Sequence, residues 1–297
     1  MRTKEVVSGT NVRGGLADLR GEPGPLSVAL VTWANLPQLT EDDRLLRAEL
    51  ERRGVETHAA VWDDPNVDWE SFDDVILRST WDYHKRIDEF RAWVAHRRRL
   101  WNPREVVLWN LHKRYLLELE HTVPTALVPA GESARDAAET RGWTRIVVKP
   151  AVSATAWRTE QLDAKDAETY DVDVLVQPFL PEIADGEWSL LFFGGEFSHA
   201  VLKRPKSGDF RVQSDFGGSV SIEAPPARLI EQAAELVKPE WLFARVDGID
   251  RGGRFLLMEL ELTEPVLFFH AHPAAPARFA DAFARIRGRQ EVLHSRP

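Results

Sequence analysis

Apolar runs and amphipathic segments alternate along the first half of the chain. The apolar runs have strand length, and the segments between them repeat their apolar positions at helical spacing. The predicted strands are 27–33, 58–62 and 74–78, and the predicted helices are 41–53 and 87–99. Such alternation is typical of a small parallel sheet covered by helices, so we predict an α/β fold for this half.

The second half mixes hairpins with helices. Asn110 is a candidate cap for a helix at 111–119, and a hairpin is predicted from Glu187 to Val201 around Gly194-Gly195. The other predicted strands are 123–128, 145–150 and 173–180, and the other predicted helices are 133–141, 226–237 and 276–287. This mixture indicates an α+β arrangement for the second half.

The predicted strand from Arg254 to Glu264 carries two carboxylates, Glu259 and Glu261, within an apolar run. Side chains two apart on a strand point the same way, so these two project together, about 7 Å apart. Strict alternation places Phe255 and Leu257 on their face. The opposite face would carry Leu256, Met258, Leu260 and Leu262. Buried anions cost free energy unless a cation lies between them, and oxygen ligands suit Mg²⁺.

A third carboxylate, Asp247, lies on the preceding predicted strand at 243–249. The short turn at 250–253 joins the two strands into a hairpin. Three carboxylates on adjacent strands therefore predict a magnesium site.

Composition narrows the class of protein. The chain has 297 residues, of which 43% are hydrophobic, enough for a substantial core in one or two domains. Its net charge of -9 gives no electrostatic support for nucleic-acid binding, and the absence of cysteine excludes disulfides and a thiol nucleophile. With neither a membrane-spanning apolar run nor a signal-peptide core, we expect a cytoplasmic protein with no membrane partner.

Basic side chains stand where an anion would suit them. Lys149 ends an apolar strand before Pro150, and Lys113 lies in the first turn of a predicted helix, where the helix dipole disfavours a cation. Lys203, Arg204 and Arg211 lie in or beside a glycine-containing loop that could grip phosphate or carboxylate oxygens. Each has a plain alternative as a solvated surface group. The segment 151–156, which contains Ser153, is rich in small residues but lacks glycine, so it is weak evidence for a phosphate loop.

In this order, these pieces resemble the ATP-grasp ligase superfamily over roughly residues 27–287. The strings Leu77-Arg-Ser-Thr-Trp-Asp-Tyr83, Val148-Lys-Pro-Ala-Val-Ser153, Gly186-Glu-Trp-Ser189 and Gly208-Asp-Phe-Arg-Val-Gln213 look like a subgroup that includes the cyclo-ligase forming the cycloserine ring. The resemblance implies an ATP-grasp fold preceded by a parallel-sheet domain. We expect a disordered leader at 1–25, a substrate domain at 26–110, a small ATP-grasp subdomain at 111–180 and a metal-binding subdomain at 181–297.

The resemblance also implies roles for individual residues. ATP contacts are implied for Lys113, Lys149, Ser153, Gln177, Pro178, Phe179, Leu180, Glu187 and Arg211. Among these, 177–180 would form the hinge that reads adenine and Glu187 would bind the ribose, while Lys149 and Arg211 would act on the transferred phosphate. Asp247, Glu259 and Glu261 would hold one or two Mg²⁺ ions, or Mn²⁺; many relatives have Asn in place of Glu261.

A substrate site is expected where a parallel strand of the first sheet ends, because open α/β sheets bind ligands there. The candidates are Arg78, Ser79, Trp81, Asp82 and Tyr83, with Arg204 from the basic loop. Arg78 would hold a substrate carboxylate. The alternative for Trp81 and Tyr83 is packing on the neighbouring helix.

The resemblance implies an ADP-forming ligase that phosphorylates a carboxylate or similar carbonyl oxygen of a small amino-acid-like substrate. An amine or similar nucleophile would then displace phosphate, in an intermolecular or a ring-closing reaction. A small-molecule kinase on the same fold and a nucleotide-binding protein without catalysis are the alternatives, and relatives are often homo-oligomers.

Overall fold

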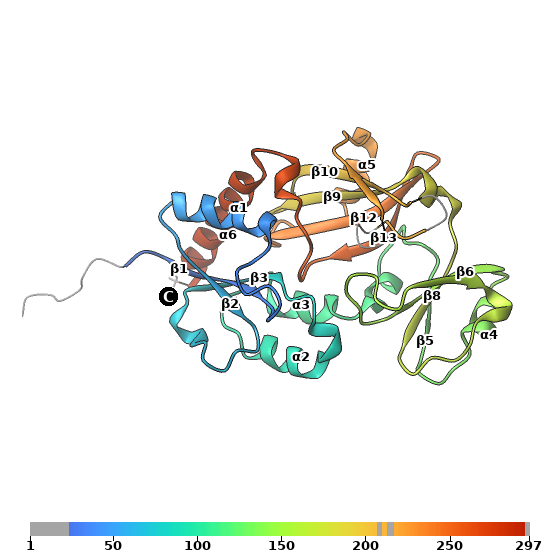
Figure 1. Cartoon of the computed structure of the whole chain (residues 1–297). Helices are drawn as coiled ribbons and strands as arrows, with labels where there is room; N and C mark the ends of the chain where they lie inside the picture. Colours follow the sequence, from blue (N-terminus) through green and yellow to red (C-terminus); the bar gives the residue numbers. More distant parts are fainter. Residues whose placement is uncertain (1–23, 207–209, 213–216, 295–297) are drawn as a thin grey trace, which may run out of the picture.

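The computed structural model describes residues 24–206, 210–212 and 217–294. The predicted leader at 1–25 therefore falls almost wholly outside the described residues. Three sheets are arranged along the chain, as Figure 1 shows. Mixed α and β structure with one parallel and two antiparallel sheets confirms the predicted fold class.

The first sheet has the strand order β2-β1-β3-β4, and its pairs are parallel. Its elements are β1 (Ser27–Thr32), α1 (Glu41–Arg52), β2 (Glu56–Val61), β3 (Asp74–Ser79), α2 (Ile87–Ala95), β4 (Leu100–Trp101) and α3 (Arg104–Asn110). Helix α1 begins where the Thr40 hydroxyl accepts a hydrogen bond of 2.9 Å from the Asp43 amide. Leu46 and Leu50 then bury one face of α1, as the helical spacing predicts.

The second sheet, drawn in green at the right of Figure 1, has the order β5-β8-β6-β7 and is antiparallel. Its elements are β5 (Ala126–Val128), α4 (Ala134–Glu139), β6 (Arg145–Pro150), β7 (Glu160–Asp163) and β8 (Val174–Pro178). The Ser133 side chain caps α4 by accepting from the Asp136 amide. This sheet holds Lys149 on β6 and the segment 177–180 at the end of β8.

The third sheet has the order β11-β10-β9-β12-β13. Its elements are β9 (Glu187–Phe193), β10 (Glu196–Arg204), β11 (Ser219–Ser221), α5 (Ala227–Ala234), β12 (Phe243–Arg251), β13 (Arg254–Glu261) and α6 (Ala275–His294). The predicted hairpin between β12 and β13 is confirmed. Helix α6 returns to pack against α1 of the first sheet.

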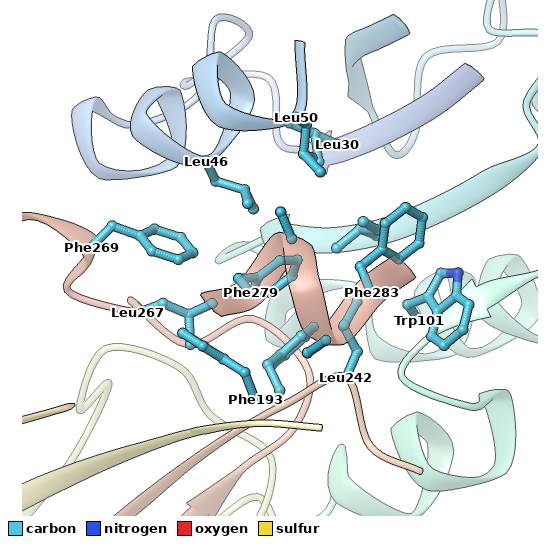
Figure 2. Close-up of a cluster of buried hydrophobic side chains, with 14 of the residues drawn as sticks. Leu30, Leu46, Leu50, Trp101, Phe193, Leu242, Leu267, Phe269, Phe279 and Phe283 are labelled. Atoms are coloured by element: carbon cyan, nitrogen blue, oxygen red, sulfur yellow. The ribbon is translucent and has the colours of Figure 1, made fainter. Parts of the chain in front are cut away.

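A hydrophobic cluster joins the first and third sheets, so these two predicted domains share a core. Figure 2 shows Phe279 and Phe283 of α6 between Leu46 of α1 and Leu242 beside β12. All four side chains are almost fully buried. Replacing a buried phenylalanine with alanine costs about 3–5 kcal/mol, so this cluster fixes the parts of the site relative to each other.

The predicted helix at 111–119 is wrong. Asn110 instead ends α3, and a short 3-10 helix follows at Lys113–Leu117 with His112 as its cap. The Asn110 amide donates to the Leu260 carbonyl at 2.8 Å and accepts from the Leu262 amide at 2.8 Å. Because β13 lies at the edge of its sheet, its free backbone groups need partners, and a buried asparagine supplies them.

Buried His199 links β10 to the segment after β13. Its Nε2 lies 2.9 Å from the Leu267 carbonyl, and burial lowers the pKa of His199 to about 4. The unfolded chain, with a histidine pKa near 6.5, therefore binds the proton first. The contribution of neutral His199 to the free energy of unfolding is therefore complete above pH 6.5 and is lost as the pH falls toward 4.

We predict that His199→Gln flattens the acid dependence of stability. Between pH 7 and pH 4, the free energy of unfolding of the wild type should fall by about 3 kcal/mol more than that of the variant. Urea titrations at a series of pH values measure this difference. Parallel curves for the two proteins would contradict the assignment.

Candidate active site

A cavity of about 390 Å³ lies where the three parts of the chain meet. It receives side chains from the segment after β3, from β6 and β8, and from β9, β10, β12 and β13. Its charged lining residues are Lys113, Lys149, Glu187, Lys203, Arg211, Arg245, Asp247, Glu259, Glu261 and Glu264.

The structure brings most of the sequence-predicted residues to this cavity. The predicted nucleotide contacts that line it are Lys113, Lys149, Ser153, Gln177, Pro178, Phe179, Leu180, Glu187 and Arg211, and all three predicted metal ligands line it as well. Of the predicted substrate residues, Trp81 and Tyr83 line the cavity. Residues far apart in the sequence therefore share one site.

A β-bulge aims the carboxylates of β13 into the cavity. Asp247 pairs with Glu259, but the next residue, Gly248, pairs with Leu257, so Met258 is the extra residue. Only glycine fits beside the bulge, because a Cβ on Gly248 would lie 2.6 Å from the Leu256 carbonyl oxygen.

The bulge corrects the predicted faces of β13. Strict alternation would group Phe255 and Leu257 with the carboxylates, yet both lie in a hydrophobic core with Leu260 and Leu262. Met258, Glu259 and Glu261 line the cavity instead. Glu259 and Glu261 still share a side because the extra residue precedes both of them.

Arg245 is a functional candidate that sequence reasoning missed. It lies two residues before Asp247 on β12, and its Nη2 donates to Asp247 at 3.0 Å and also to Glu261. Although burial opposes ionisation, Arg245 and Lys203 hold the pKa of Asp247 at about 2. The available signal was the two-residue spacing of Arg245 and Asp247, which puts both on one face of the strand.

Two lysines neutralise further carboxylates of the cavity. Lys113 pairs with Glu259, and Lys203 pairs with both Glu187 and Asp247. Burial, together with the neighbouring carboxylates of Glu259 and Asp247, raises the pKa of Glu261 to about 7 despite Arg245. These ion pairs hold several buried carboxylates close together. Additional positive charge in the cavity would stabilise the ionised form of these carboxylates.

Lys149 lacks a carboxylate partner among the described residues. Its Nζ lies 3.4 Å from the Met258 carbonyl, and burial lowers its pKa although the negative charge of Glu259 opposes this effect. A buried ammonium group that lines a cavity without a direct carboxylate partner is suited to an anionic ligand.

The donor chemistry of the site fits magnesium. Asp247 and Glu259 are paired across adjacent strands, and Glu261 lies on the same side of β13. Carboxylate oxygens are the ligands that Mg²⁺ prefers. Within residues 24–206, 210–212 and 217–294, however, no group of three or more acidic, histidine or cysteine residues is arranged to hold a metal. Each carboxylate contacts a protein cation instead, so metal binding would exchange ion pairs for coordination.

The structure does not bring Arg78 to the cavity. This almost fully buried residue donates to Asp43 at 2.8 Å and to the Pro265 carbonyl at 2.8 Å. The end of β3 is covered by the segment that follows β13, so Arg78 joins the two parts and is not free to hold a substrate carboxylate. This corrects our expectation for Arg78.

Three other predicted substrate residues also have partners away from the cavity lining. Ser79 shares a hydrogen bond of 2.9 Å with Thr32, and Asp82 accepts from the Trp62 indole at 2.9 Å. Arg204 pairs with Glu223. None of these three residues lines the cavity.

Trp81 connects the first sheet to a residue that sequence reasoning left without a role. Its indole donates to the backbone carbonyl of Glu264 at 3.0 Å. The Glu264 side chain lines the cavity, and burial, with the negative charge of Glu261, raises its pKa to about 8.

Comparison with known proteins agrees with this fold. Residues 28–102 match the family model for the N-terminal domain of the D-cycloserine synthetase DcsG. The cycloserine biosynthesis protein DcsG of Streptomyces lavendulae is 30% identical, over 87% of this chain and 95% of that protein.

Solved structures give the same result. A crystal structure of D-cycloserine synthetase DcsG superposes with a TM-score of 0.75 and 27% identity, over 87% of this chain and 99% of that one. The ATP-grasp ligase PsnB, solved with Mg and ADP, superposes with a TM-score of 0.58 at 16% identity, over 88% of this chain and 100% of that one. The latter likeness concerns the fold alone.

The fold and the cavity thus define an ATP-grasp ligase, an ATP-dependent enzyme. Within that class, the chain belongs to the family of the cycloserine biosynthesis protein DcsG. None of the helices described is both long and apolar enough to span a membrane.

We predict that Glu261→Gln weakens the metal-dependent binding of nucleotide. The glutamine still offers an oxygen to Arg245, so the fold should persist, but the site loses a negative charge. The Mg²⁺ concentration needed for half-maximal binding of a non-hydrolysable ATP analogue should rise about tenfold or more.

Calorimetric titration at several Mg²⁺ concentrations measures this change, with Glu231→Gln on exposed α5 as the matched control. An unchanged Mg²⁺ requirement in Glu261→Gln would remove Glu261 from the metal site.

Proposed function

We propose that this protein is an ADP-forming ligase that activates the carboxylate of a small amino-acid-like substrate. The observation that carries the proposal is the cavity itself, where Asp247, Glu259 and Glu261 face the cations Lys149 and Arg211. Such an arrangement suits phosphoryl transfer, which requires charge neutralisation and positioning more than an acid or a base.

The nucleotide would occupy the part of the cavity between the second and third sheets. The segment 177–180 begins at the end of β8, where the Gln177 side chain donates a hydrogen bond of 2.8 Å to the Thr125 hydroxyl, and this segment would read adenine. Glu187 at the start of β9 would bind the ribose hydroxyls. This placement rests on the resemblance together with the position of these residues in one cavity.

Lys113, Lys149 and Arg211 would bind the phosphate oxygens. Asp247, Glu259 and Glu261 would hold magnesium, which supplies positive charge to the phosphates when bound. Arg245 would keep Asp247 and Glu261 oriented toward the cavity, because it contacts both. The γ-phosphoryl group would pass to a carboxylate oxygen with departure of ADP, and a nucleophile would then displace phosphate from the acyl carbon.

Ring closure is the form of this reaction that the comparisons support. The 30% identity to a cycloserine biosynthesis protein spans nearly the whole of both chains, including the N-terminal sheet. We therefore propose that the nucleophile belongs to the same molecule as the activated carboxylate, as in cycloserine formation.

We predict that hydroxylamine traps the activated substrate. Incubation with Mg-ATP, a panel of O-substituted serines and hydroxylamine should yield a hydroxamate, because hydroxylamine attacks an acyl phosphate. Mass spectrometry detects this product, and a reaction without ATP is the control. ADP formation accompanied by a stable phosphate ester, without hydroxamate, would indicate a kinase instead.

A further inference from the structure

One corner of the cavity has a carboxylate without a cationic partner. Glu187, Asp247, Glu259 and Glu261 each form an ion pair with a lysine or arginine. The structure gives the Glu264 carboxylate no hydrogen bond or ion pair with any residue it describes. Among the described carboxylates that line this cavity, Glu264 is therefore the exception.

The surroundings of Glu264 make this exception costly. Its side chain is only partly exposed, and burial, together with the negative charge of Glu261, raises its pKa to about 8, although Lys113 and Arg245 act in the opposite direction. A desolvated carboxylate of this kind is stabilised by a cation that arrives with a ligand.

Two aromatic residues of the first sheet border the same corner. The Trp81 indole donates to the Glu264 carbonyl, and the almost fully buried Tyr83 also lines the cavity. The Tyr83 hydroxyl lies 3.4 Å from the Ser153 carbonyl, and burial raises the pKa of Tyr83, with the negative charge of Glu264 adding to the effect. Aromatic side chains beside a carboxylate are a favourable environment for an organic cation.

We propose that Glu264, which lines the cavity together with Trp81 and Tyr83, binds the ammonium group of the acceptor substrate. The inference rests on the proposed function and narrows its substrate class to carboxylic acids that carry a free primary amine. The cations Lys149 and Arg211 attract the anionic part of the reactants, whereas the corner at Glu264 attracts the cationic part.

A structural role does not account for Glu264. The contact with Trp81 uses the backbone carbonyl of Glu264, which any residue would supply, and leaves its carboxylate unused. The Glu264 carboxylate is thus available to a ligand.

Glu264→Gln tests the inference by calorimetry on the full-length protein loaded with Mg²⁺ and a non-hydrolysable ATP analogue. The probes are O-acetyl-serine and O-carbamoyl-serine in both enantiomers, each paired with the same acid lacking its amine. The wild type should bind at least one amine-bearing probe about 10–100-fold more tightly than its partner, the range for a hydrogen bond between charged groups.

The variant should lose this discrimination while its thermal midpoint at pH 8 stays equal or rises, since a desolvated charge has been removed. Its Mg²⁺ requirement should not change, and Glu231→Gln should behave as the wild type. Equal binding of both members of every pair, absence of binding by any amine, or an altered Mg²⁺ requirement in Glu264→Gln would overturn the inference.

ADP release with the same probes separates this inference from the proposed function. Turnover of the acids lacking an amine, at rates equal to those of the amino acids, would leave a ligase whose Glu264 has no role in amine binding. Absence of ADP and hydroxamate with every carboxylic acid would overturn the proposed function itself.

Discussion

The pairing of β12 with β13, and the bulge within it, is the constraint on which the site depends. The extra residue Met258 lets one strand serve a hydrophobic core through Phe255 and Leu257 and the cavity through Glu259 and Glu261. Without it, carboxylates and core side chains would compete for one face. Gly248 permits the bulge because a side chain there would collide with the facing strand.

Burial of so many charges in one cavity requires that the protein itself supply counter-ions. Arg245, Lys113 and Lys203 do so, and they keep the carboxylates ordered at a cost in desolvation. These ion pairs are also an electrostatic match for a nucleotide with its metal, which brings both anionic and cationic groups. The same reasoning separates Glu264, whose charge the chain leaves uncompensated, from its neighbours.

The shared core gives the cavity its rigidity. Helix α6 lies at the end of the described chain, yet it packs against α1 near the beginning, and Arg78 joins β3 to the segment after β13. Trp81 thereby contacts Glu264, which follows β13. A substrate corner built from both ends of the sequence depends on this packing, because neither end alone surrounds a cavity.

The sequence by itself determined the parallel first sheet, the β12–β13 hairpin and the nucleotide and metal candidates that line the cavity, since these follow from local periodicity, turn composition and the order of motifs. Tertiary structure decided the rest. The bulge depends on which residue faces Gly248. The role of Asn110 depends on the free edge of β13, and the burial of Arg78 depends on a segment nearly two hundred residues away. Pairings of this kind join residues distant in the chain, so the local sequence around one residue does not predict its partner.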